Sequence, residues 1–210
     1  MASNIHLESE VKFLLSDPQR IENRLLQLKG KLIQARTLEI NYRLDSQNLH
    51  LSSENKVLRL RKDVSSWLTY KGPGSYQDGI GIREEIEIPI GDIQSAIKLL
   101  EAIGFQVEQI YEKFRTVYRW NDVYVMIDHL PIGDYVELEG NDLEQIKELA
   151  IHLGLNWDRH IRMGYLQIFN LFCRLSGRQI RDIRFDDNKL LTLSDLEKMD
   201  ILPADICLNS

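Results

Sequence analysis

Residues 5–14, with the sequence IHLESEVKFL, alternate apolar and polar side chains along most of their length. Successive side chains of a β-strand point to opposite faces, so this alternation predicts a strand with two different faces. One face carries Val11 and Phe13, and the other carries Glu8, Glu10 and Lys12. The segment therefore predicts a sheet that is apolar on one side and charged on the other.

The same alternation recurs along the chain as far as residue 139, with turn-forming residues such as Gly72-Pro73-Gly74 between the alternating stretches. Including the first segment, the pattern predicts eight strands, and the other seven lie near residues 36–45, 56–62, 66–72, 80–89, 107–119, 122–129 and 134–139.

Helices are predicted where capping residues precede an apolar face. Asp17-Pro18 is typical of an N-cap followed by a first-turn proline, and Asp92 predicts a second N-cap. Asn141 with Glu144 resembles a capping box. An apolar helix is also expected from about residue 162 to residue 172.

The last part of the chain differs in character from the rest. A short helix capped by Ser194 and Glu197 is expected there. We expect one domain over residues 1–174 and a loosely attached tail or small helical appendage over residues 175–210. Removal of the tail should then leave a folded, active domain.

The composition is typical of a globular protein, with 43% hydrophobic and 28% charged residues among 210. A formal net charge of -6 argues against nonspecific binding to nucleic acid. The N-terminus has no sustained apolar stretch, and Cys173 and Cys207 have no metal-type spacing. A cytoplasmic location without a membrane span is therefore expected.

Charged residues of both signs share one face on nearly every predicted strand. The apolar faces of the helices need an apolar sheet surface, so the charged faces can meet inside a closed barrel. Eight strands form a barrel wide enough for side chains or one small ligand. The predicted fold class is therefore α+β, an eight-stranded antiparallel β-barrel with flanking helices. The alternative is a sheet whose charged face is simply solvated.

A charged interior is costly unless its charges are compensated, and a bound anion would compensate basic groups. Lysine and arginine side chains bind phosphate oxygens, the guanidinium groups in a bidentate manner. The candidate residues for binding a highly anionic substrate are Lys12, Arg59, Arg61, Lys71, Arg83, Lys113 and Arg115.

Acidic residues on the same faces favour a divalent cation. Carboxylates at positions i and i+2 lie about 7 Å apart and repel each other unless a cation lies between them. Oxygen ligands suit Mg²⁺ or Mn²⁺. Glu85 and Glu87 could hold a second metal, position a water or neutralise arginines. The candidate metal ligands are Glu8, Glu10, Asp128, Glu137 and Glu139. The alternative is that these acids form a salt-bridge lattice with the basic residues.

These segments, in this order, resemble the motifs of CYTH domains, also called triphosphate tunnel metalloenzymes. Glu8-Ser9-Glu10-Val11-Lys12 is similar to the ExExK signature of that family. The resemblance covers roughly residues 3–170, and its later elements are Glu39-Ile40-Asn41, Val57-Leu58-Arg59-Leu60-Arg61, Leu68-Thr69-Tyr70-Lys71, Arg83-Glu84-Glu85-Ile86-Glu87, Glu112-Lys113-Phe114-Arg115, Ile127-Asp128 and Val136-Glu137-Leu138-Glu139.

The resemblance implies an eight-stranded tunnel and an enzyme that uses Mg²⁺ or Mn²⁺, with Lys12, Glu85 and Glu87 as candidate catalytic residues. We expect hydrolysis of tripolyphosphate, thiamine triphosphate or a nucleoside triphosphate. One alternative is a class IV adenylate cyclase that converts ATP to cyclic AMP and pyrophosphate, and another is a non-catalytic sensor of polyphosphate or nucleotides. The expected partner is the small-molecule triphosphate, and a homodimer is left open.

Two departures from the family pattern bear on specificity. Residues 162–165 stand where many relatives have a Ser-Tyr pair, and His6 is followed by Leu7 where many class IV cyclases have a His-Phe pair. The readable site consists of phosphate and metal groups, and no set of side chains that would bind an adenine base can be identified. The sequence therefore favours hydrolysis over cyclisation.

Overall fold

The computed structural model describes residues 5–185 and 190–206. In this part of the chain, ten strands of unequal length form one sheet, and all of their pairings are antiparallel. They are β1 (Ile5–Leu15), β2 (Lys31–Ser46), β3 (Val57–Lys62), β4 (Ser66–Lys71), β5 (Ser75–Gln77), β6 (Ile80–Pro89), β7 (Phe105–Trp120), β8 (Val123–Leu130), β9 (Gly133–Glu139) and β10 (His160–Ile161).

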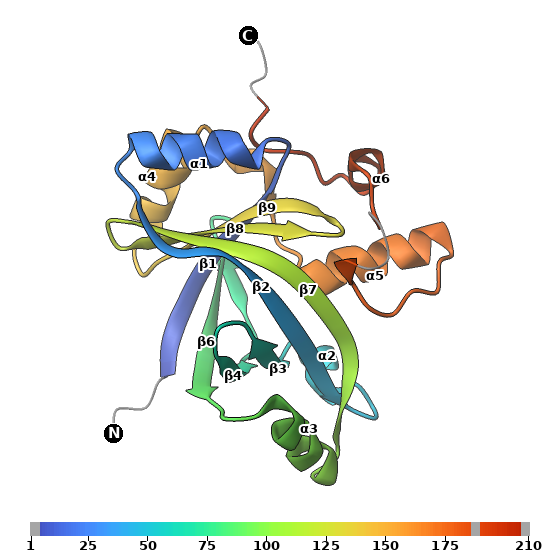
Figure 1. The fold of residues 1–210 in the computed structure, drawn as a ribbon. Coiled ribbons are helices and arrows are strands. Elements are labelled where there is room, and N and C mark those ends of the chain that lie inside the picture. The colour runs from blue at the N-terminus through green and yellow to red at the C-terminus, as the bar shows by residue number, and fades with distance from the viewer. Residues whose placement is uncertain (1–4, 186–189, 207–210) are drawn as a thin grey trace.

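Eight of the strands close into a ring (Figure 1). The order is β1-β9-β8-β7-β2-β3-β4-β6. Strand β6 closes the ring by pairing with β1, in a register that runs from Ile5↔Ile86 to Glu10↔Gly81. The predicted antiparallel ring of eight strands is thus confirmed. It is uneven, because β2 and β7 have 16 residues each whereas β3 and β4 have six. The short strands β5 and β10 lie at the two ends of the strand order and were not predicted.

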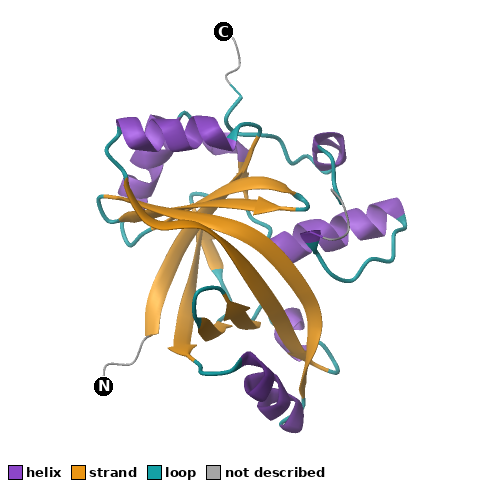
Figure 2. Cartoon of the chain, in the orientation of Figure 1, coloured by secondary structure: helices purple, strands orange, loops and turns teal. Residues whose placement is uncertain are grey.

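Helices pack around the ring (Figure 2). They are α1 (Pro18–Gln27), α2 (His50–Ser53), α3 (Ile93–Ala102), α4 (Leu143–Leu153), the 3₁₀ helix η1 (Trp157–Arg159), α5 (Tyr165–Ser176) and α6 (Leu193–Lys198). None of the helices in the described residues is long and apolar enough to cross a membrane.

The helix caps agree with the sequence at two positions and differ at two. Asp17 and Asp92 accept hydrogen bonds from the first turns of α1 and α3, as predicted. The N-cap of α4 is Asp142 rather than Asn141, because the Asp142 carboxylate accepts from the first exposed N–H groups of the helix. For the same reason, Thr192 and not Ser194 caps α6.

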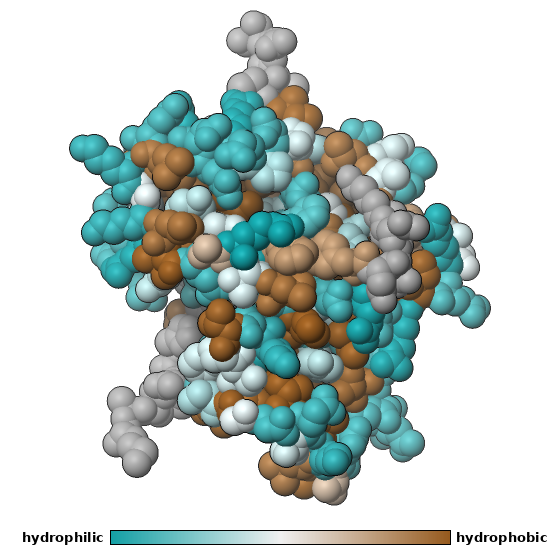
Figure 3. Space-filling model, viewed as in Figure 1, coloured by the Kyte–Doolittle hydropathy of each residue, from teal (hydrophilic) through white to brown (hydrophobic). Residues whose placement is uncertain are grey.

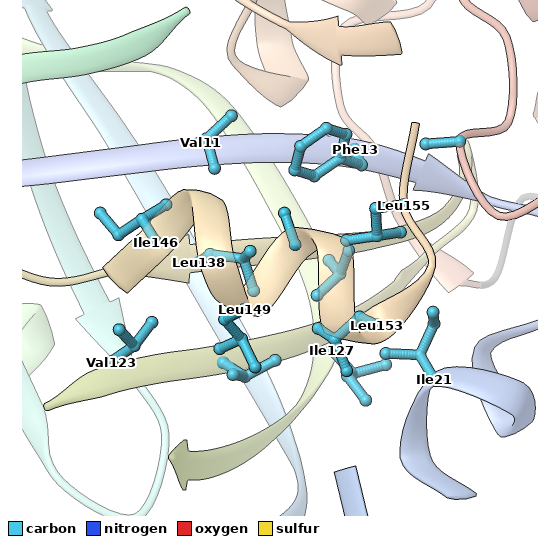
Figure 4. Close-up of a cluster of buried hydrophobic side chains, with 14 of the residues drawn as sticks. Val11, Phe13, Ile21, Val123, Ile127, Leu138, Ile146, Leu149, Leu153 and Leu155 are labelled. Atoms are coloured by element: carbon cyan, nitrogen blue, oxygen red, sulfur yellow. The ribbon is translucent and has the colours of Figure 1, made fainter. Parts of the chain in front are cut away.

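The outer face of the ring carries a large apolar core. Val11, Val125 and Leu138 from three neighbouring strands pack against Ile21 of α1 and Leu149 of α4. Figure 4 shows Leu149 of α4 with Val11, Leu138 and other labelled side chains of this core around the helix. A smaller cluster includes residues of β2 and β3 together with α3. The helices therefore cover apolar outer faces, which leaves the charged faces turned inward.

A third apolar cluster lies where the interior changes from charged to apolar. Leu14 follows Lys12 on the same face of β1, and Tyr135 precedes Glu137 on the same face of β9. Both Leu14 and Tyr135 are buried in a cluster with α5, which contributes Tyr165 among others. Helix α5 therefore covers this end of the charged interior.

The described residues of the C-terminal segment, 175–185 and 190–206, contribute buried side chains that pack on the ring and on α5. Buried side chains from this segment, including Leu196 and Ile201, join the cluster around α5. The Asp205 carboxylate accepts hydrogen bonds from the backbone N–H groups of Ser16 and Asp17, both at 2.8 Å. Burial of apolar side chains fixes the tail, and the sequence pattern did not reveal which surface they would cover. The domain boundary at residue 174 stays a prediction.

Two leucines on α6 test how firmly the tail is attached. Leu196 is 1% exposed and Leu193 is 41% exposed. Leu196→Ala should lower the free energy of unfolding by about 3 kcal/mol, because it leaves a cavity in the core. Leu193→Ala is the matched control and should change it by less than about 1 kcal/mol. Urea unfolding followed by circular dichroism measures both, and a negligible effect of Leu196→Ala would mean that the tail is not part of the cooperative unit.

Candidate functional site

A cavity of about 910 Å³ lies inside the ring and is lined by side chains from all eight ring strands and from α5. The described lining residues include eleven basic and seven acidic side chains. The chain as a whole has the opposite balance, with 26 basic and 32 acidic residues. The interior therefore concentrates positive charge and favours an anionic ligand. On the outer face shown in Figure 3, hydrophobic and hydrophilic residues are interspersed.

The structure brings most of the predicted site residues together. All seven basic candidates line this cavity, as do Glu10, Glu85, Glu87, Glu137 and Glu139. Asp128 lies in the same interior but is buried behind the lining. The side chain of Glu8 falls outside the described residues, although its backbone pairs with Arg83. Strand alternation therefore assigned the inward face correctly, while the roles of these residues stay predictions.

Asp128 is the most deeply buried acid of the site, with 0% exposure. It accepts hydrogen bonds from Lys113 Nζ at 3.1 Å, Arg115 Nε at 2.6 Å and the Tyr165 hydroxyl at 2.8 Å. Both carboxylate oxygens are engaged, so in this arrangement Asp128 holds two of the predicted phosphate-binding side chains in place. The contact with Tyr165 also ties the ring interior to α5.

Glu137 lies beside this group and is held by basic residues on two sides. Lys12 Nζ lies 3.0 Å from one carboxylate oxygen, and Arg115 donates to the other. Burial alone would raise the pKa of Glu137, but Lys12 and Arg115 hold it well below its usual value. Burial likewise opposes the charge on Lys12, and Glu137 and Glu10 raise its pKa overall. The pair is therefore ionised at neutral pH.

Glu39 is a member of the site that the sequence reasoning missed. Its carboxylate lies 3.4 Å from Lys113 Nζ and accepts from Asn41 Nδ2 at 2.9 Å. Burial by itself would raise the pKa of Glu39, but Lys113 and Arg115 lower it to about 2. Glu39, Asn41 and Arg43 alternate along β2, so the period that identified the other strands could have found them.

A second group of charges lies on β3, β4 and β6, which continue the ring between β2 and β1. Lys71 Nζ lies 3.1 Å from Glu85, and Arg61 Nη2 donates to Glu87 at 3.1 Å. Glu87 also accepts from the Thr69 hydroxyl at 2.7 Å. These contacts leave both glutamates on the cavity wall in fixed positions.

Arg59 carries an unsatisfied donor. Its Nη1 group donates to the Tyr111 hydroxyl at 3.4 Å, whereas its buried Nε has no hydrogen-bond partner among the described residues. Buried polar groups are nearly always paired, so an orphaned donor on a cavity wall is available to a ligand. Burial opposes the charge of Arg59, but Tyr111, Glu39 and Glu85 raise its pKa, so it remains cationic. An anion with several oxygens would satisfy it.

Two facing acidic side chains on the cavity wall form a candidate site for a divalent cation. Glu10 and Glu139 are direct cross-strand neighbours of β1 and β9, and both line the cavity. Like charges directly opposite each other are destabilising, and a cation between them would relieve the repulsion. The described residues contain no group of three or more potential protein ligands. Because Mg²⁺ is often held by one or two carboxylates plus substrate phosphates, the Glu10–Glu139 pair fits such an ion.

The depressed pKa of Glu39 makes stability depend on pH. The carboxylate is more acidic in the folded chain, so its contribution is complete above the ordinary value of 4.5 and is lost as pH falls toward about 2. Wild-type stability should therefore fall between pH 5 and pH 3. Glu39→Gln should cost about 3 kcal/mol at pH 7, because it leaves Lys113 with one acid fewer.

Urea titrations at pH 7, 5, 4 and 3 measure this difference. The exposed Glu84→Gln on the outer face of β6 is the control and should follow the wild type. If Glu39→Gln shows the same loss of stability at every pH, then ionisation of Glu39 does not stabilise the fold.

Comparison with known proteins supports the assignment of this site to a family. The CYTH domain model matches residues 6–156. A protein of Methanocaldococcus jannaschii named "Putative adenylate cyclase" is 28% identical over 177 residues, which cover 79% of this chain and 99% of that protein.

Solved structures share the fold. A protein of Vibrio parahaemolyticus described as a "putative adenylate cyclase" superposes with a TM-score of 0.71 at 20% identity, over 79% of this chain and 98% of that one. A Hippeastrum protein, described as a "putative adenylyl cyclase" with a dominant triphosphatase activity, has a TM-score of 0.60 at 19% identity, over 82% and 97%. With the family model matching more than half of its length, this chain belongs to the CYTH domain family.

Proposed function

We propose that this chain is a metal-dependent phosphohydrolase that acts on triphosphate compounds bound in the ring cavity. The observation that carries the proposal is the excess of basic side chains on the cavity wall, including half-buried Arg59, whose buried Nε has no partner among the described residues. A triphosphate offers many oxygen acceptors and several negative charges in one chain, which matches this wall. The triphosphatase activity described for the Hippeastrum protein is compatible with the same function.

In this proposal, the basic residues of both charged groups in the cavity bind the substrate. Arg59 and Arg61 from β3 lie on one side of the ring, and Lys113 and Arg115 from β7 belong to another. Lys12, Lys71 and Arg83 complete the predicted set. Because Asp128 and Glu137 already fix Arg115, the wall is organised before the substrate arrives. Such preorganised charge is the main source of rate in phosphoryl transfer, which needs positioning more than covalent chemistry.

The acidic residues divide into two roles in this proposal. The Mg²⁺ or Mn²⁺ ion would be held by Glu10 and Glu139. Glu137 and the predicted ligand Glu8 lie two residues away from these acids in sequence and would contribute to the same site. When bound, the ion supplies Lewis-acid neutralisation of phosphate charge. Asp128 is a predicted ligand as well, and its three donors favour a positioning role instead.

Glu85 and Glu87 line the same cavity from β6, the neighbour of β1, and would orient a water toward the terminal phosphorus. Lys71 and Arg61 hold these two carboxylates in place. Lys12 would contact the reacting phosphoryl group from β1, where Glu137 keeps it charged. This arrangement places a candidate water-orienting acid and the metal-binding acids on different strands around one cavity.

Cyclisation of ATP is the second candidate, because the M. jannaschii relative carries an adenylate cyclase name. The same basic wall could orient ATP for attack of the ribose 3′-hydroxyl on the α-phosphorus, with pyrophosphate leaving. A sensor without activity is the third candidate. The facing acids Glu10 and Glu139 disfavour a sensor, since anion binding alone would not require such a pair.

Arg59→Ala tests the anion-binding role. The variant should weaken tripolyphosphate binding by roughly 1.5–3 kcal/mol, the range for hydrogen bonds to charged groups. Arg119→Ala, which removes a surface ion pair with Asp122, is the matched control and should bind normally. Calorimetric titration measures both. Equal affinities for the two variants would place the ligand away from Arg59.

A product profile tests the reaction and its metal requirement together. Tripolyphosphate, thiamine triphosphate and ATP are each incubated with Mg²⁺, Mn²⁺ or excess chelator, and phosphate, pyrophosphate and cyclic AMP are separated by chromatography. We expect phosphate release that depends on the metal and exceeds cyclic AMP formation. Glu10→Gln should reduce turnover at least about tenfold and weaken Mn²⁺ binding measured by electron paramagnetic resonance, because it removes an anionic ligand.

Glu84→Gln serves as the control for the charge change and should retain full turnover. Cyclic AMP as the main product from ATP would establish the cyclase alternative. Full activity in excess chelator would instead remove the metal from the proposal.

A further inference from the structure

One wall of the cavity differs in chemistry from the charged remainder. It consists of Met163, Leu166 and Asn170 from the start of α5 and the segment before it, together with Gln109 of β7 and Ile180 of the tail. All but Gln109 lie beyond residue 156, where the match to the CYTH model ends. Met163, Leu166 and Ile180 also pack against the apolar cluster around α5. The cavity therefore has an apolar and amide-bearing side that the phosphate-binding residues do not account for.

The unequal strand lengths explain why the tail reaches this wall. Strand β8 pairs with β7 only from Phe114 onward, so the preceding part of β7 has an edge that β8 does not cover. Residue Ile183 fills that edge, because its N–H donates to Ile110 O at 2.9 Å and its carbonyl accepts from Glu112 N at 2.8 Å. These backbone bonds hold the neighbouring Ile180 against the cavity.

The amide groups of this wall are arranged as a reciprocal pair. Gln109 Nε2 donates to Asn170 Oδ1 at 2.9 Å, and Asn170 Nδ2 donates to Gln109 Oε1 at 3.1 Å. Gln109 Nε2 also donates to the Arg181 carbonyl at 2.9 Å. Each amide has two donor hydrogens and two acceptor lone pairs, so the Asn170 amide in particular retains capacity for a ligand. Asn170 is exposed, which places that capacity at the rim.

A planar heterocycle binds to an apolar surface that lies beside hydrogen-bond donors and acceptors. The ring face packs on aliphatic side chains, and its nitrogen and exocyclic groups need hydrogen-bonding partners. Arg181 also lines the cavity, and its Nε donates to Asp182 at 3.2 Å. A guanidinium plane is a group that can stack on such a ring. A volume of about 910 Å³ lies near the upper end of small-molecule sites, so the cavity has room for an organic group beside a triphosphate.

We propose that this wall, formed by Gln109, Met163, Leu166, Asn170 and Ile180, binds a planar nitrogen heterocycle attached to the triphosphate. The proposal rests on the proposed function, because it assumes that the charged wall holds the phosphates. It makes the substrate an organic triphosphate rather than bare tripolyphosphate. Nucleobases and the pyrimidine of thiamine share this chemistry, and the choice of substrate distinguishes them.

Three variants on α5 test the wall. Leu166→Ala removes apolar contact, Asn170→Ala removes the rim amide, and Arg174→Ala changes an exposed residue of the same helix that does not line the cavity. KM and kcat are measured for ATP, GTP, thiamine triphosphate and tripolyphosphate, and thermal unfolding shows that each variant is folded.

We expect the wild type to have a lower KM for one of the organic triphosphates than for tripolyphosphate. Leu166→Ala and Asn170→Ala should each raise that KM about tenfold while KM for tripolyphosphate stays within about twofold. Arg174→Ala should change neither. A parallel rise for all substrates, or no preference for an organic triphosphate in the wild type, would overturn the proposal.

Binding separates this proposal from the hydrolase assignment. If no triphosphate is hydrolysed, calorimetric titration with the same compounds still measures whether Leu166→Ala weakens an organic triphosphate selectively. Selective weakening would support the wall even though the assigned reaction had failed. Equal weakening of organic triphosphate and tripolyphosphate binding would refute the proposed role of this wall, whatever the reaction is.

Discussion

The buried carboxylate of Asp128 is the interaction on which the arrangement of the interior depends. A fully buried charge is tolerated only when donors surround it, and here Lys113, Arg115 and Tyr165 supply them. Two donors come from β7 and the third comes from α5, so one residue links the ring wall to the helix that covers its end. Removing a single partner would leave the other charges buried and uncompensated.

This lattice also explains why the cavity is ready to bind an anion. Acidic side chains hold Arg115 and Lys113 in place, while the basic side chains on β3 and β6 reach the cavity from the other side. Positive charge exceeds negative charge on the wall although the chain as a whole is acidic. A ligand with several phosphate oxygens would satisfy donors such as Arg59 Nε, which finds no partner in the described part of the chain. Fold stability and ligand binding thus draw on the same charges.

Alternation in the sequence was sufficient to predict the eight ring strands and the inward-facing charged residues on most of them. The period of two directly determines which side chains share a face, so the alternation alone placed Arg59 and Arg83 correctly on the inward face. Glu39 could have been found by the same rule. The period contains no information on which strands pair, and the closure of β6 on β1 depends on tertiary packing.

Contacts made by helices and by the tail were the least predictable part of the site. Tyr165 reaches Asp128 from α5, and helical periodicity identifies an apolar face without naming the surface it covers. Ile183 completes the edge of β7 only because β8 is shorter, a difference that single-strand patterns do not reveal. The amide pair of Gln109 and Asn170 joins residues 61 positions apart, which explains why this pairing was not visible in the sequence.

The most direct test of the central claim is a crystal structure of the protein with a non-hydrolysable triphosphate analogue and Mn²⁺, using anomalous scattering to locate the metal. The account predicts phosphate oxygens on Arg59 and Arg115 inside the ring, with an anomalous peak beside Glu10 and Glu139. Triphosphate density outside the ring, or an interior that stays closed by its own ion pairs when the analogue is saturating, would contradict it.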